Sequence, residues 1–270
     1  MEYLLKRSRF VVSVARMKLR EWGMYRFRLF IWILSGVIEP IVWSVLWFAV
    51  SSETKAMSLN GAQVLTYYAL IALVGRITQS WTYDDLRKEI YEGRYSKYLL
   101  WPSSMVLYRL GLDLGNKVMN IVTMLPLWFL WVAVLSSYDL WDIGNAGLIS
   151  VGMSVLLAVM VKFSLDIVLA HCALWVERAE GIGTLYNYVL RVCGGMIVPL
   201  ALLPGWAGGL FSILPFRYVY SFPVEIVMGT VEGSDVTWGF AIGGMWCLLM
   251  LGAVSVLLRK GLPLYEAVGI

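Results

Sequence analysis

Runs of about 20 mostly apolar residues are the feature of this chain that most restricts its fold. A helix rises about 1.5 Å per residue, so such a run spans the roughly 30 Å hydrocarbon core of a bilayer. Hydrophobic residues make up 60% of the chain and charged residues only 15%, whereas soluble domains carry about 25% charge. The sequence therefore predicts an all-α integral membrane protein. The six candidate transmembrane helices are residues 29–50, 63–81, 105–135, 146–173, 182–203 and 238–258.

The basic residues of the loops predict how these spans are oriented. The segment before the first span carries eight Lys and Arg residues and the 82–104 loop adds four, whereas the 136–145 loop carries none. Cytoplasmic loops of membrane proteins are enriched in Lys and Arg. Both termini are therefore expected in the cytoplasm, which requires an even number of spans. We expect residues 1–270 to form a single multi-pass domain.

Two further segments do not read as ordinary spans. Residues 4–21 place apolar side chains on one helical face beside a basic stripe, which is typical of an interfacial amphipathic helix; an ordinary solvated helix is the alternative. Residues 196–216 are apolar but contain three prolines and a Gly-Gly pair. Since proline breaks helices and bare backbone cannot face lipid, we expect a re-entrant or interfacial hairpin on the outer side.

Several functional classes are not indicated by the sequence. There is one histidine, His171, and three cysteines at unrelated spacings, so neither a metal site nor a disulfide framework is predicted. The G-x-x-x-x-G-K-[ST] loop that binds nucleotide phosphates is missing, as are catalytic motifs of a membrane-embedded enzyme. The net charge of +4 is concentrated beside apolar runs, which favours membrane orientation over nucleic-acid binding. Any ATP that drives this protein is therefore expected on another chain.

Glu39 and Arg191 are ionisable residues inside predicted spans. Each lies about ten residues from the cytoplasmic start of its span, so both are expected near the bilayer midplane. Charged groups at that depth are costly and are candidates for function. The two residues are interpreted either as a structural ion pair or as a polar point beside a substrate path.

A second group of charges lies nearer the cytoplasm. Arg109, Asp113 and Lys117 follow one another at intervals of four residues, and Lys162 and Asp166 have the same spacing. Opposite charges at this spacing can pair within a helix. The two sets are interpreted as a structural network that joins helices or as a cytoplasmic gate.

The inner loop between the second and third spans predicts a short charged helix. Asp84 and Asp85 suit the N-terminus of a helix, and Gly93 can end it in the left-handed conformation. A compact charged helix between two long spans is typical of a docking element for a cytoplasmic partner. A simple solvated connector is the alternative.

Three segments carry a resemblance to a known family. The run IYEGRYSKYLLWPSS (90–104) resembles the E-G-R/L-D-x-x-L-L-R-P-x-S signature of permeases in the type 2 ABC exporter superfamily. Segment 195–229 resembles a second signature, I-P-L-x-x-x-P followed by L-P-F and P-x-x-I-x-x-G, and 261–269 resembles the closing pattern. The chain is thus similar to the bacterial permeases of roughly this length. Trp101 stands where arginine is common and Tyr95 where aspartate is common, which concerns the partner surface rather than the family.

The resemblance implies a fold with an interfacial N-terminal helix, six spans, a cytoplasmic coupling helix at 84–94 and an outer re-entrant hairpin after the fifth span. It implies that the coupling helix docks on an ATPase subunit through Asp85, Arg87, Lys88, Glu89, Tyr91, Glu92, Gly93 and Arg94. It also implies an outer gate formed by Pro199, Pro204, Leu214, Pro215 and Phe216.

The same resemblance implies partners and a location. A second permease, identical or related, would share the translocation path, and two ATPase subunits would bind ATP and Mg. No cofactor is expected on this chain, which would reside in the cell (inner, cytoplasmic) membrane. The alternative function is an ion-coupled secondary transporter or a channel that works without an ATPase. That class typically shows inverted repeats with broken helices, which this sequence does not display.

Overall fold

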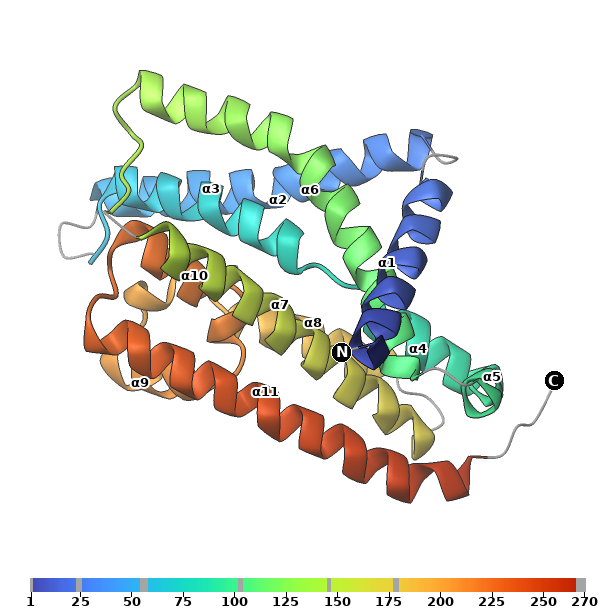
Figure 1. The fold of residues 1–270 in the computed structure, drawn as a ribbon. Helices are drawn as coiled ribbons and strands as arrows, with labels where there is room; N and C mark the ends of the chain where they lie inside the picture. The colour runs from blue at the N-terminus through green and yellow to red at the C-terminus, as the bar shows by residue number, and fades with distance from the viewer. Residues whose placement is uncertain are drawn as a thin grey trace.

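A computed structural model describes residues 2–22, 26–53, 58–101, 104–144, 147–176 and 180–265. All regular secondary structure within these ranges is helical, and no strand occurs in them, as the sequence predicted. The long helices run side by side along one axis, and the short helices gather at the two ends (Figure 1).

Five long helices form the body of the bundle. They are α2 (Arg26–Glu53), α3 (Gly61–Thr78), α6 (Met105–Ser137), α7 (Leu148–His171) and α11 (Ser234–Gly261). In the described part of the chain, α6, α7 with its short extension, and α11 are long and apolar enough to cross a membrane. They correspond to three of the predicted spans. The first predicted span lies within α2, which includes the shorter apolar stretch Gly36–Ser51. The second, 63–81, covers most of α3 and extends three residues past its end.

The start of α3 illustrates how local sequence sets a helix boundary. Asn60 precedes the helix, and its side-chain oxygen accepts a hydrogen bond of 2.8 Å from the Gln63 backbone. The Gln63 side chain in turn accepts one of 3.1 Å from the Asn60 backbone. This capping box satisfies two backbone donors that have no partner inside the helix.

Only the first part of the predicted fifth span, 182–203, is a continuous α-helix. The helix in this region, α8 (Glu180–Cys193), ends where Gly194 and Gly195 turn the chain. Gly195 has a backbone φ of +84°, which residues other than glycine rarely adopt. A Cβ on Gly194 would overlap the Tyr220 ring. The apolar run continues past this turn, so hydropathy alone placed the end of the helix ten residues too late.

Residues 196–216 do not form a continuous helix. A 3-10 turn, η2 (Leu200–Leu202), is followed by α9 (Gly205–Ile213). Pro199 and Pro204 immediately precede these two elements, and Pro215 follows the C-cap residue Leu214. Proline is tolerated at the start of a helix and disfavours helical conformation in the residue before it, so the prolines set these boundaries.

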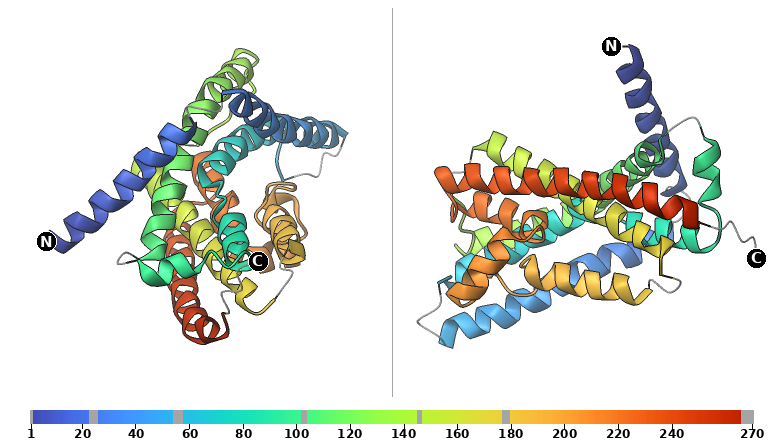
Figure 2. Two further views of the ribbon diagram at one scale, coloured as in Figure 1. Left: turned by 90° about the vertical axis from the view of Figure 1, so that its right-hand side faces the viewer. Right: turned by 90° about the horizontal axis from the view of Figure 1, so that it is seen from below.

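The N-terminal helix α1 (Glu2–Trp22) runs across the bundle rather than along it (Figure 2). It packs on the start of α6, where Gly111 and Gly115 permit a close approach because a Cβ on either would overlap α1 atoms. Val11 and Val14 are buried, whereas Val12 is exposed, so part of the apolar face predicted for 4–21 covers α6.

The two ends of the bundle differ in content. Helix α1, the short helices α4 (Thr82–Tyr91) and α5 (Ser96–Leu100) and the end of α11 gather at one end. Helices α9 and α10 (Ser221–Met228) lie at the other end (Figure 1). The main hydrophobic core lies between α3, α7, α8 and α10, and a smaller cluster around Leu86 and Ile90 lies under α4.

Candidate functional site

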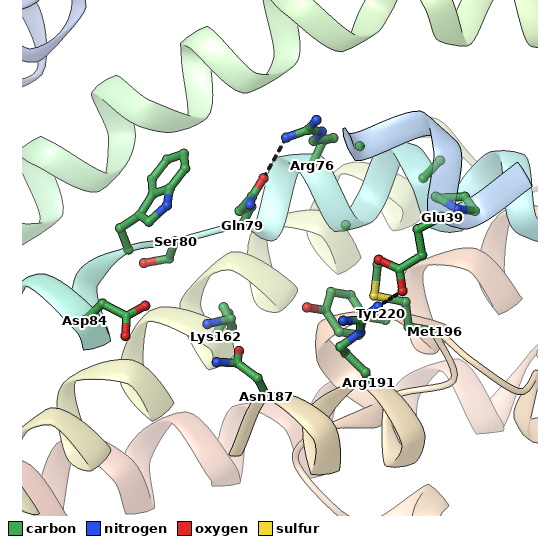
Figure 3. Close-up of a pocket in the computed structure, with 15 residues that line it drawn as sticks. Glu39, Arg76, Gln79, Ser80, Asp84, Lys162, Asn187, Arg191, Met196 and Tyr220 are labelled. Carbon is green, nitrogen blue, oxygen red and sulfur yellow. Dashed lines mark hydrogen bonds and ion pairs between the residues drawn. The ribbon is translucent and has the colours of Figure 1, made fainter. Parts of the chain in front are cut away.

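A polar cavity of about 370 Å³ opens between α2, α3, α7 and α8 (Figure 3). It extends from Glu39 in the middle of α2 to Asp84 on α4, so it connects the interior of the bundle with the α4 end. The polar side chains on its wall are Glu39, Arg76, Gln79, Ser80, Asp84, Lys162, Asn187, Arg191 and Tyr220. Three of the seven charged residues singled out within the predicted spans, Glu39, Lys162 and Arg191, therefore share one cavity.

Glu39 and Arg191 form an ion pair that joins α2 to α8. Both side chains are about one-third exposed, at 34% and 33%, and both face the cavity. Pro40 follows Glu39 and lacks the amide donor that would bond to the Gly36 carbonyl one turn earlier. The ion pair thus stands beside a weakened turn of α2.

Arg76 of α3 is a cavity residue that the sequence analysis missed. Its side chain is buried and donates a hydrogen bond of 3.0 Å to Gln79. A Cβ on Gly36 would overlap its guanidinium, so the glycine of α2 makes room for this arginine. The signal was available, because Arg76 is a charged residue inside the predicted 63–81 span, as Glu39 is inside the first.

The pair predicted on α7 is buried. Lys162 donates to Asp166 at 2.5 Å, and the Tyr186 hydroxyl of α8 donates to the same carboxylate oxygen at 2.9 Å. This carboxylate therefore connects α7 to α8, and Lys162 contributes to the cavity wall. Removing either charge would leave the other buried without compensation.

The pair on α6 lies outside the cavity wall. Lys117 is 2.9 Å from Asp113 and donates to the backbone carbonyls of Thr78 and Gln79 at 3.3 and 3.2 Å. The last carbonyls of a helix have no partner within it and carry partial negative charge, which a cation offsets. Lys117 thus caps α3 at the point where the chain turns toward α4.

Arg109 does not join the other two charged residues on α6. Its guanidinium is 2.5 Å from Glu89 and 3.8 Å from Asp85, both on α4. The four-residue spacing suggested that Arg109 could pair with Asp113 within the helix, but in the structure its partners are on α4. The spacing could not reveal this cross-helix partner.

The short inner helix is formed much as predicted. Asp84 and Asp85 lie in the first turn of α4, and Gly93 follows the helix with a φ of +71°. Asp84, Asp85, Lys88 and Tyr91 are exposed on α4, and Glu92 and Arg94 are exposed just after it.

The opposite face of α4 points into the protein. Leu86 and Ile90 are buried, and the Glu89 side chain is only 14% exposed. Burial raises the pKa of Glu89, but hydrogen bonds from Lys97 and Tyr98 and the charge of Arg109 outweigh it, so the pKa is lowered. Glu89, predicted as a docking residue, therefore faces α5 and α6 rather than solvent.

The segment predicted as an outer gate begins at the cavity and leads to the opposite end of the bundle. Met196 lines the cavity, and the Ile197 carbonyl accepts hydrogen bonds from Trp47 and Tyr68 at 3.0 and 2.8 Å. Pro199 and Pro215 are buried, Pro204 is exposed, and Leu214 and Phe216 are half-buried. In the part of the chain that the structure describes, no three His, Cys, Asp or Glu residues are grouped to hold a metal ion.

One family of known proteins matches most of the chain. Residues 28–269 match the family described as ABC-2 family transporter protein, which leaves only residues 1–27 and Ile270 outside the match. A search of curated proteins finds no match.

Proposed function

Because the chain belongs to the ABC-2 transporter family, we propose that it is the permease subunit of an ATP-driven exporter. Family membership makes it a transmembrane subunit of an ABC transporter and a multi-pass membrane protein. It also makes the chain a transport component rather than an enzyme. ATP-driven export, docking through α4 and pairing with a second permease, identical or related, are the parts that we propose. ATP and Mg would be bound by separate ATPase subunits.

The topology that we propose has six spans and cytoplasmic termini, in the inner (cytoplasmic) membrane. Helix α1, α4 and the end of α11 share one end of the bundle, which agrees with the basic segments of the sequence. The fifth span would combine α8 with the irregular chain that follows. The 14 residues of α8 extend only about 21 Å, less than the hydrocarbon core. Irregular backbone is tolerated at membrane depth when protein covers it.

The exposed face of α4 is the observation that carries the docking proposal. It presents acidic, basic and aromatic side chains next to one another, and Tyr91 is 67% exposed. Aromatic and charged side chains of this kind supply affinity and register at protein interfaces. The buried face packs against the end of α7, so α4 is a folded helix supported by the bundle rather than a loose loop.

The cavity is the proposed entrance for the substrate from the cytoplasmic side. Its volume falls in the range of small-molecule sites, about 300–1,000 Å³. It begins at α4 and reaches the Glu39–Arg191 pair, from which 196–216 continues to the other end of the bundle. This arrangement supports a path whose inner part is polar and whose outer gate is apolar.

Co-purification with the candidate ATPase subunit tests this proposal. The wild-type complex, purified in nanodiscs, is expected to contain two permeases and two ATPases and to hydrolyse ATP. Combined Lys88→Ala and Tyr91→Ala substitutions on the exposed face of α4, together with Arg94→Ala just after it, should abolish association. Arg259→Ala, an exposed arginine on α11, is the matched control and should leave the complex intact. A wild-type chain that associates with no ATPase would overturn the assignment and favour ion coupling.

A further inference from the structure

Glu89 is the point at which α4, α5 and α6 meet. Its carboxylate accepts a hydrogen bond of 2.8 Å from Lys97 and one of 2.7 Å from the Tyr98 hydroxyl, both on α5. Arg109 of α6 donates to it at 2.5 Å. Three donors from two other helices thus converge on one side chain of α4.

The contact between Glu89 and Arg109 resists displacement for an electrostatic reason. Its guanidinium is only 2% exposed, and a buried charge is costly unless it keeps its partner. Any displacement of α4 must therefore carry Arg109 with it or separate a buried ion pair. The apolar contacts of Leu86 and Ile90 with the end of α7 are not directional and can slide, as packed helices do in shear motions.

The same region of α6 also holds the end of α3. Lys117 caps the carbonyls of Thr78 and Gln79, and Asn120 donates to the Arg76 carbonyl at 3.3 Å. Helix α6 thus contacts both the end of α3 and, through Arg109, helix α4, which flank the turn between them. That turn supplies Gln79 and Ser80 to the cavity wall, and the first turn of α4 supplies Asp84.

From these contacts we infer that Glu89 is a positioning residue that transmits movement of α4 to α6 and, through the α3–α4 turn, to the cavity. This inference rests on the proposed function and identifies where ATPase movement enters the membrane domain. In this account the exposed face of α4 binds the ATPase, and the buried face transmits the movement of α4 to α6. Losing Glu89 should therefore uncouple the cavity from the ATPase without preventing their association.

A cysteine in the cavity provides the measurement. The native Cys172, Cys193 and Cys247 are replaced by alanine, and Asn187→Cys is introduced on the cavity wall. Asn187 is suitable because, among the described residues, its side chain bonds only to the Gly183 carbonyl of its own helix. The complex with the ATPase, in nanodiscs, is treated with a membrane-impermeant maleimide with and without ATP and Mg, and the labelling rates are compared.

In the wild-type background, ATP is expected to change the labelling rate at least about fivefold, the lower range of coupling between sites. Glu89→Gln should form the same complex but lose most of this change, and Glu89→Asp should restore part of it. If Glu89→Gln folds poorly, Tyr98→Phe is tested in its place, because it removes one hydrogen-bond donor to Glu89 and keeps the aromatic ring. Its ATP response should be reduced.

Each outcome is decisive. If the wild-type complex does not form, the proposed function and this inference both fail. If the complex forms and Glu89→Gln or Tyr98→Phe retains the full ATP response, only the inference fails. Loss of association in Glu89→Gln, at unchanged thermal stability of the permease, would also contradict it, because Glu89 would then act in docking.

Discussion

Helices α4 and α9, at opposite ends of the bundle, differ in their charged contacts, although an Arg217–Glu225 ion pair lies near α9 on η3 and α10. At the α4 end, directional ion pairs and hydrogen bonds converge on Glu89 and fix α4 relative to α5 and α6. At the other end, α9 contains no charged residue, and its Trp206 side chain is 77% exposed. Ion pairs lose most of their energy when displaced, whereas apolar contacts can exchange partners at small cost. Under the proposed function, α4 would transmit movement and the uncharged α9 would belong to the outer gate.

The largest expected effect comes from the buried pair on α7. Asp166→Leu should destabilise the permease by about 3–5 kcal/mol, because it leaves the buried charge of Lys162 without its partner. The free energy of unfolding is measured by denaturant titration in mixed micelles. The double variant with Lys162→Met should recover much of the loss, since an apolar pair replaces the ion pair. A single-variant cost below about 1 kcal/mol would show that the pair is not buried in the membrane.

A smaller effect is expected at the junction on α4. Glu89→Gln should cost about 1.5–3 kcal/mol, the range for hydrogen bonds to a charged group. Lys88→Gln, one residue earlier on the exposed face, is the control and should stay within about 0.5 kcal/mol. Equal costs for the two variants would mean that the two faces of α4 do not differ as described.

The stability difference between wild type and Glu89→Gln should depend on pH. The pKa of Glu89 is lowered in the folded state, so its ionised form favours folding. This contribution is fully present above the ordinary pKa of about 4.5 and is lost as the pH falls through the lower folded value. Melting temperatures of both proteins, measured between pH 7 and about pH 3.5, should therefore approach each other at the acidic end. A difference that grows on acidification would contradict this account of Glu89.

The smallest effect on stability is expected at the α9 end. Trp206→Ala should change the free energy of unfolding by less than about 0.5 kcal/mol, because most of the side chain is already exposed. Thermal unfolding of both proteins in the same detergent checks this. A loss as large as that of Glu89→Gln would remove the contrast between the two ends.

The sequence predicted the parts of the fold that depend on local composition. Helix α4 followed from Asp84, Asp85 and Gly93, and the prolines of 196–216 correctly indicated interrupted helix. The end of α8 was missed because hydropathy does not register a left-handed turn at Gly195. The family assignment is confirmed, whereas six-span topology and partner docking stay predictions.

The sequence indicated which charged residues lie inside the bundle more readily than it indicated their ion-pair partners. Four-residue spacing predicted the pairs on α6 and α7, because both partners lie on one helix. It could not predict that Arg109 reaches Glu89, since that contact depends on how α4 packs against α6. Cross-helix geometry also explains why Glu89, an apparent docking residue in the sequence, is directed inward.

Photo-cross-linking from the two ends of the bundle tests the central claim most directly. A photoreactive amino acid is placed at position 91 on the exposed face of α4 or at position 206 on α9, in membranes that contain the candidate ATPase. Position 91 should cross-link to the ATPase subunit and position 206 should not. Cross-links to the ATPase from position 206, or none from position 91, would contradict the assignment of α4 as its docking helix.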